Sequence, residues 1–233
     1  MTTKCPFLAM VIFSLAVSLR GAAEPNTLTA AERAAGWKLL FDGQSLTGWR
    51  SYQSATPGAS WKIIDGALVA TVPKTDDLLT VGTFGDFELS IEWKIAEAGN
   101  SGILYRVGLN EPHSYETGPE YQLLDNQKAR GREFPARHAG ALYDLIAPAT
   151  DTAKPAGEWN ETRILVRDWR LEHWLNGVKL LEADLGSAKG KALIGSSKFA
   201  KMPKFAALRS GHIALQDYGN VVSFRNIRIR ELK

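Results

Sequence analysis

Cysteine is almost absent from this chain of 233 residues, because Cys5 is the only one. Cys5 lies ahead of an apolar run and has no lipobox of small residues before it, so it does not read as a lipid-attachment site. A chain without paired cysteines cannot be a disulfide scaffold and must be held by its apolar core. A domain of this length can bury about 70% of its unfolded surface, which is enough.

The sequence also lacks an apolar run that is long enough to cross a bilayer comfortably. The best candidate, residues 7–19, falls short of the roughly 20 residues that a spanning helix needs. Lys4 precedes this run, and the small residues Gly21-Ala22-Ala23 follow it, as in a secretory signal peptide.

We therefore expect residues 1–23 to be a signal peptide and residues 24–233 to form one exported domain, periplasmic or extracellular, without stable membrane insertion. The alternative is an uncleaved membrane anchor, which Arg20 at the end of the run weakly favours.

An excess of charge of one sign is missing as well. The formal net charge is +3, and it falls to +1 when Lys4 and Arg20 leave with residues 1–23, which contain no acid. Nucleic acid is therefore not an expected partner. The content of 7 Trp and 6 Tyr suits an uncharged, ring-shaped ligand such as a sugar, although in a β-rich chain most tryptophans belong to the core.

Helical patterns are scarce, and one short helix is predicted after Thr29. Glu32 lies three residues further on, which makes a capping box, and Gly36 ends the helix. From there the apolar period is two. It is clearest in residues 86–95, where apolar and polar side chains alternate as in a half-buried strand.

Similar strands are predicted at residues 61–71, 102–107, 120–124, 141–146, 163–167, 171–175, 178–182, 212–216 and 221–231. Asn176-Gly177 and Asp65-Gly66 read as tight turns. Many short strands without βαβ alternation predict an all-β, two-sheet antiparallel sandwich. Residues 187–208 do not follow the strand pattern. We expect them to form a long connection outside the sheets that serves packing rather than function.

Short motifs in order along the chain resemble the 3-keto-disaccharide hydrolase family. They are GWKLLFDG (36–43), LTGW (46–49), SGI (101–103) with YR (105–106), EYQLLD (120–125), GALYD (140–144), WN (159–160), HWLNG (173–177), IALQD (213–217) and FRNI (224–227). One residue departs from the family pattern, because Tyr218 follows Gln-Asp where the family usually has histidine.

The resemblance implies a concanavalin A-like jelly roll and the cleavage of 3-keto-glycosides by 1,2-elimination and hydration. The substrate would be a sugar that a separate sugar 3-oxidoreductase has oxidised. Elimination from a ketone is redox-neutral, and no G-x-G-x-x-G follows a strand, so no cofactor is expected. No ligand-spacing motif indicates a metal either.

Such chemistry needs a base for the C2 proton, a donor for the enolate oxygen and an acid for the leaving oxygen. Strand alternation places Glu120 and Gln122 on the face opposite Tyr121 and Leu123, which belong to the core. Arg106 is the candidate donor to the ketone. A surface salt bridge between Arg106 and Glu120 is the structural alternative.

Histidine supplies further candidates. His138 ends a basic loop that could act as a lid, and it titrates in a range suited to acid–base catalysis. Glu120, His138 and Arg106 are thus the predicted catalytic residues. His173 lies on the face of its strand shared with Leu171 and Leu175, so it is either a buried core histidine or a ligand contact.

The remaining candidates for substrate binding lie near strand ends and in the matched motifs. With Gln122 and His173, they are Asp125, Tyr143, Gln216 and Asp217. For Asp217, turn chemistry is a sufficient alternative explanation.

Two other functions stay open. An ordinary glycoside hydrolase needs two carboxylates about 5 to 9 Å apart, and Glu120 and Asp125 lie an odd number of residues apart, which puts them on opposite faces of a regular strand. A non-catalytic carbohydrate-binding module would use the same sandwich.

Overall fold

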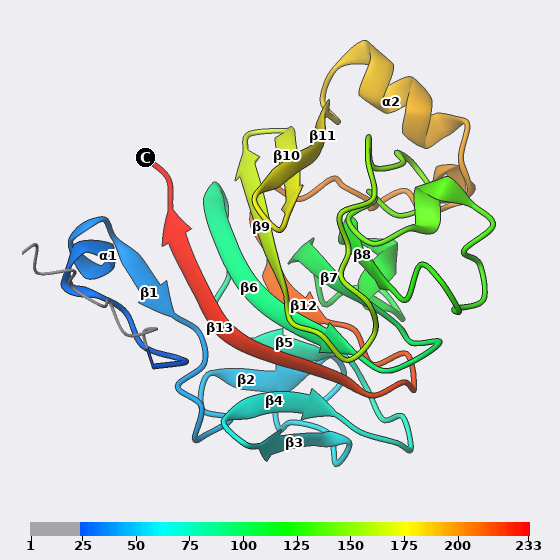
Figure 1. Cartoon of the computed structure of the whole chain (residues 1–233). Helices are drawn as coiled ribbons and strands as arrows, with labels where there is room; N and C mark the ends of the chain where they lie inside the picture. Colours follow the sequence, from blue (N-terminus) through cyan, green and yellow to red (C-terminus); the bar gives the residue numbers. More distant parts are fainter. Residues whose placement is uncertain (1–23) are drawn as a thin grey trace, which may run out of the picture.

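The computed structural model describes residues 24–233, so the predicted signal peptide and Cys5 lie outside the described residues. The chain forms two antiparallel sheets that pack face to face (Figure 1), as predicted. The larger sheet has the strand order β11-β10-β9-β6-β13-β4-β3, with β1 paired to β13, and the smaller one has the order β2-β5-β12-β7-β8. Among the described helices, none is long and apolar enough to cross a membrane.

The strands of the larger sheet are β1 (Trp37–Leu39), β3 (Trp61–Ile64), β4 (Ala67–Ala70), β6 (Phe87–Ile95), β9 (Asn160–Arg167), β10 (Arg170–Leu175), β11 (Val178–Asp184) and β13 (Val222–Glu231). Those of the smaller sheet are β2 (Trp49–Ser51), β5 (Leu78–Thr80), β7 (Asn100–Val107), β8 (Glu120–Leu124) and β12 (His212–Leu215). The helices are α1 (Ala30–Ala34), α2 (Ala188–Gly195) and the 3₁₀ turns η1 (Ser114–Glu116), η2 (Pro135–Arg137) and η3 (Lys198–Lys201).

Period-two alternation builds the core between the sheets. Phe87, Leu89 and Trp93 of β6 are fully buried and meet the equally buried Tyr121 and Leu123 of β8. Each such side chain contributes roughly 1.5 to 3 kcal/mol by leaving water. The capping box predicted for α1 is confirmed, because Thr29 and Glu32 hold each other's backbone N–H groups.

Some predicted elements differ from the structure. The predicted strand at 141–146 is wrong: this segment makes only isolated bridges at Leu142, and Asp144 has a positive φ of 55°. β1, β2 and β5 were not predicted, because three residues are too few to show a period.

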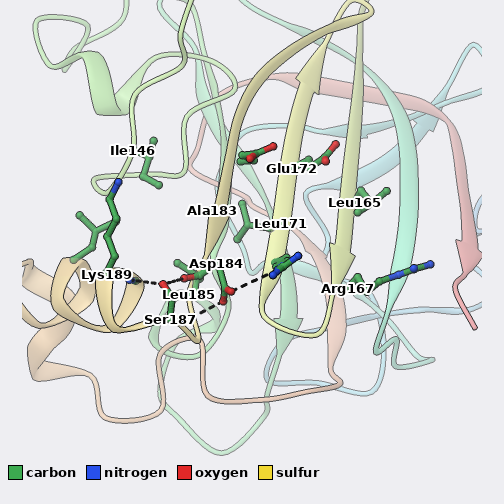
Figure 2. Close-up of a pocket in the computed structure, with 14 residues that line it drawn as sticks. Ile146, Leu165, Arg167, Leu171, Glu172, Ala183, Asp184, Leu185, Ser187 and Lys189 are labelled. Atoms are coloured by element: carbon green, nitrogen blue, oxygen red, sulfur yellow. Dashed lines mark hydrogen bonds and ion pairs between the residues drawn. The ribbon is translucent and has the colours of Figure 1, made fainter.

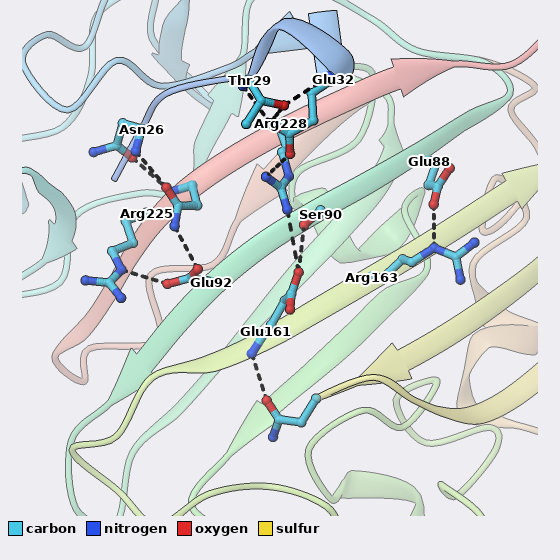
Figure 3. Close-up of polar contacts among 12 residues, drawn as sticks. Asn26, Thr29, Glu32, Glu88, Ser90, Glu92, Glu161, Arg163, Arg225 and Arg228 are labelled. Atoms are coloured by element: carbon cyan, nitrogen blue, oxygen red, sulfur yellow. Dashed lines mark hydrogen bonds and ion pairs between the residues drawn. The ribbon is translucent and has the colours of Figure 1, made fainter. Parts of the chain in front are cut away.

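Ion pairs cover the outer face of the larger sheet (Figure 3). Glu88 of β6 accepts hydrogen bonds from Arg163 and Arg230, and these lower its pKa even though burial acts in the opposite direction. Glu92 binds Arg225 in the same way at 2.7 Å. Because these charges satisfy one another, this face offers a ligand few free polar groups.

Candidate functional site

A cavity of about 370 Å³ lies on the outer face of the smaller sheet. Its polar lining comes from β7, β8, the end of β12, the loops around them and the 3₁₀ turns η1 and η3. It includes Asp76, Asp77, Asn100, His113, Ser114, Glu120, Gln122, Tyr143, Lys198 and Gln216. The volume lies within the range of about 300 to 1,000 Å³ that is typical of small-molecule sites.

A larger cavity, of about 630 Å³, lies between β11 and α2 (Figure 2). Apolar side chains such as Leu171 and Leu193 line it together with charges that are exposed or paired, as Arg170 is with Asp184 at 3.6 Å. No carboxylate that lines it is buried in the described structure. The smaller cavity is therefore the candidate active site.

Glu120 is the central side chain of the smaller cavity. Alternation along β8 turns it away from the core, as predicted, yet it is only 6% exposed. Its carboxylate lies against the backbone of Gly102, where a Cβ atom would come within 2.1 Å of Oε1. Burial, and then the nearby charge of Asp77, raise the pKa of Glu120 to about 8. A carboxyl group with such a pKa can act as base or acid near neutral pH.

Asp77 is a second carboxylate in this cavity, and the sequence analysis missed it. It accepts hydrogen bonds from the Ser114 hydroxyl and, at 2.9 Å, from the backbone N–H of Asp217. Burial raises its pKa. The only sequence signal is an acidic pair just ahead of two leucines, and nothing local indicates that Ser114 will hold it.

Lys198 brings a cation to the cavity from η3. Its ammonium lies 2.6 Å from Asp144 Oδ2 and 4.1 Å from the centre of the Tyr143 ring. The sequence analysis expected residues 187–208 to serve packing and placed none of their side chains in a cavity. This connection holds α2 and η3 and contributes Lys198 and Phe199 to the cavity wall.

Gln122, Tyr143 and Gln216, all predicted as binding residues, line the cavity with Glu120. Gln122 Nε2 donates to Asn100 Oδ1 at 2.7 Å, which fixes both amides. The backbone N–H of Gln216 donates to the Gly102 carbonyl at 2.9 Å. These contacts place one row of amide side chains across β8, β7 and the end of β12.

The predicted convergence of Arg106 with Glu120 is wrong. β7 carries one more residue than β12 at this point, and Arg106 has a positive φ of 53°. This bulge turns its side chain to the gap between the sheets, as bulges commonly do. The guanidinium donates to the Gly85 carbonyl at 2.9 and 3.0 Å and pairs with Asp86 at 2.9 Å.

Neither predicted histidine reaches the cavity. His138 follows η2 and its Nε2 lies 2.7 Å from the Arg132 carbonyl oxygen, so its predicted place beside Glu120 is wrong. His173 is a core residue, with Nε2 3.1 Å from the Tyr105 hydroxyl and Nδ1 3.0 Å from the Gly140 carbonyl. Burial lowers the pKa of His173 to about 4. The prediction of a substrate contact at His173 is therefore also wrong.

The two turn aspartates support the backbone instead of lining the cavity. Asp125 accepts from the N–H groups of Ala98 at 2.8 Å and Gln127 at 3.0 Å. Asp217 accepts from Thr75 N at 2.9 Å and the Ser60 hydroxyl at 2.7 Å. Both were predicted to bind substrate, and both are structural. No group of three or more His, Cys, Asp or Glu residues within 24–233 is arranged to hold a metal ion.

Comparisons with known proteins indicate the family of the chain. The chain is 34% identical to the 3-keto-disaccharide hydrolase of Bacteroides thetaiotaomicron over 95% of its own length and 87% of that protein. A crystal structure from Parabacteroides distasonis, named as a proposed glycosyl hydrolase, is 35% identical with a TM-score of 0.85 and covers 90% of this chain and 100% of its own.

A Bacillus subtilis protein with a galectin-like fold shares the sandwich alone, at 14% identity and a TM-score of 0.51, over 90% of this chain and 95% of that one. The family described as the 3-keto-alpha-glucoside-1,2-lyase-like domain matches residues 36–230. With this match and the relative at 34% identity, the chain belongs to the 3-keto-alpha-glucoside-1,2-lyase-like family.

Proposed function

We propose that this protein cleaves 3-keto-glycosides at the cavity of the smaller sheet. The observation that carries the proposal is Glu120, a buried carboxyl group whose pKa is raised to about 8. A ketone at C3 makes the C2 proton acidic, so a base of this strength can remove it. The name of the Bacteroides relative supports the same substrate class.

The reaction balances without a redox partner. Glu120 takes the C2 proton, the C2–H electrons form an enolate, and the enolate expels the C1 oxygen, which leaves as an alcohol after receiving a proton. Water then adds its oxygen to C1 and a proton to C2 of the unsaturated 3-keto sugar. The sum is hydrolysis, and the oxidation state of the sugar does not change, so no nicotinamide or flavin takes part in cleavage.

The neighbours of Glu120 fit the other two roles. Lys198 takes the place that the sequence analysis gave to Arg106, since an ammonium group has three donors and Asp144 occupies only part of them. It donates to the enolate oxygen. Asp77 holds a proton more readily than an exposed aspartate because burial raises its pKa, and it protonates the leaving oxygen.

The substrate also implies a preceding step. A glycoside reaches the 3-keto state only by oxidation at C3, so we propose that a separate sugar 3-oxidoreductase supplies it. Activity of the purified protein on an unoxidised disaccharide that appears only with added NAD would contradict this division of labour.

The test of the function compares a 3-keto-disaccharide with its unoxidised parent. Wild type is expected to cleave only the keto sugar, and Glu120→Gln to lower kcat/KM by about 10²-fold or more, as expected for loss of a base. Glu133→Gln, at an exposed position, is the matched control. Equal loss in both variants would contradict the role of Glu120.

An ordinary glycoside hydrolase is the second candidate, because that reaction needs a pair of carboxylates and the cavity is lined by three, Asp76, Asp77 and Glu120. Comparable cleavage of the keto sugar and its parent would favour it. Binding of both sugars without turnover would favour a carbohydrate-binding module instead.

A further inference from the structure

Tyr218 is an exposed aromatic residue in the wall of the catalytic cavity. Its side chain is 56% exposed although it lines the same cavity as Glu120. Its recorded ring contact is Lys74, whose ammonium lies 5.8 Å from the ring centre. The other exposed tyrosine of the cavity, Tyr115, is already stacked on His113 at 5.0 Å and 16°.

The backbone beneath Tyr218 is firmly held. The preceding residue, Asp217, is fully buried and accepts from Thr75 and Ser60, while its own N–H donates to Asp77. The following turn is closed by Gly219, whose N–H donates to Asp217 Oδ1 at 3.1 Å. Because its backbone is fixed, Tyr218 is pre-organised, and ordering it costs little entropy when a ligand binds.

Strand register relates Tyr218 to Glu120 within the shared cavity. Gly102 is the common neighbour, because the Glu120 carboxylate lies against it and its carbonyl binds Gln216 N. Tyr218 is two residues beyond Gln216, which is at most about 7 Å of chain. Neighbouring strands lie about 4.8 Å apart, so Tyr218, which follows β12, lies roughly two strand spacings from Glu120 on β8. A substrate of two sugar rings in the shared cavity can therefore contact both side chains.

Lys198 and Tyr218 lie toward opposite sides of Glu120. The backbone N–H of Tyr143 donates to the Glu120 carbonyl at 3.0 Å, on the free edge of β8, and Lys198 lies over the Tyr143 ring. Tyr218 follows β12, which is separated from β8 by β7. If Lys198 binds the C3 oxygen, the C1 substituent extends toward β12.

We propose that Tyr218 is a specificity-determining residue, on which the ring of the leaving group stacks. This inference rests on the proposed function and deepens it. It makes Tyr218 the residue that recognises the sugar leaving group of a 3-keto-disaccharide and that gives no advantage to a small alkyl group. The apolar C–H face of the sugar packs on the tyrosine ring, as flat apolar surfaces do on aromatic side chains.

The experiment measures kcat/KM for two substrates, a 3-keto-disaccharide and the methyl 3-keto-glucoside. The leaving group is an alcohol in both, but only that of the disaccharide is a sugar ring. Tyr218→Ala is expected to lower kcat/KM for the disaccharide about 3- to 10-fold and to leave the methyl glycoside within about twofold. Tyr218→Phe keeps the ring and should behave like wild type. Phe134→Ala removes an exposed aromatic ring outside the cavity and is the matched control.

A second measurement does not depend on turnover. The free leaving sugar should inhibit wild type more strongly than Tyr218→Ala by a similar factor. Equal losses on both substrates, or no loss on either, would overturn the inference and leave the proposed function intact. Failure of wild type to cleave either 3-keto-glycoside would overturn both.

Discussion

In the proposed mechanism Glu120 is both buried and catalytic, so its ionisation is the point at which pH acts on the enzyme. With a pKa raised to about 8, only about one tenth of the molecules carry the carboxylate at pH 7. If the carboxylate is the base, kcat/KM for a 3-keto-glycoside should rise about tenfold per pH unit below pH 8 and level off above it. A profile measured from pH 6 to 9.5 that falls over this range would show that Glu120 acts as the acid.

The same residue should make folding stability depend on pH. A carboxyl group whose pKa is raised from 4.5 to about 8 on folding stabilises the protein fully below about pH 4.5, and this contribution is lost as pH rises to about 8. Glutamine does not titrate. We therefore expect the melting temperature of Glu120→Gln, relative to wild type, to increase between pH 5 and pH 9.

The expected change in unfolding free energy is on the order of a few kcal/mol. The control is Glu133→Gln, at an exposed position, whose difference from wild type should stay flat. A constant difference for Glu120→Gln would show that its carboxyl group is not buried in solution.

At the scale of elements, Arg106 shows what a single bulge does to a strand. Its guanidinium joins the end of β7 to Gly85, Asp86 and the Asp168 carbonyl, beside the larger sheet. Arg106→Met should therefore lower the free energy of unfolding by about 1 to 3 kcal/mol, as expected when the carbonyl of Gly85 loses a charged donor. Urea unfolding measures this change.

Activity supplies the complementary readout for this variant. Because Arg106 lies outside the cavity, the folded fraction should keep kcat/KM within a few-fold of wild type. If Arg106→Met lost activity 10²-fold while its stability stayed unchanged, Arg106 would have a direct role in the active site.

The elements also show how far sequence reasoning reaches. The alternation in β6 and β8 predicted both the sandwich and the outward direction of Glu120 and Gln122, because a regular strand fixes side-chain direction locally. The bulge at Arg106 is invisible to that argument, since its cause is one residue fewer on β12. Asp77 reaches the cavity from the loop before β5 and Lys198 from η3. Their contacts with Ser114 and Asp144 are created only by the tertiary fold.

At the scale of the whole molecule, we propose that residues 1–23 direct export and are removed. The basis is the short apolar run followed by small residues, which is typical of a signal peptide. N-terminal sequencing of protein recovered from outside the cytoplasm should begin near Glu24. Recovery of the chain with an intact N-terminus from a membrane fraction would contradict this.

Gly102 has a consequence for how this enzyme can change over time. A Cβ atom there would lie within 2.1 Å of Glu120 Oε1, so the carboxylate occupies space that exists only because the residue has no side chain. The substitution Gly102→Ala would displace the Glu120 carboxylate, the acid–base group of the proposed mechanism. The sequence would still contain every residue that lines the cavity. A protein that evolved from this one and lost activity in this way would still carry Glu120. A sequence comparison that checks only the acidic residues would then misidentify it as an active enzyme.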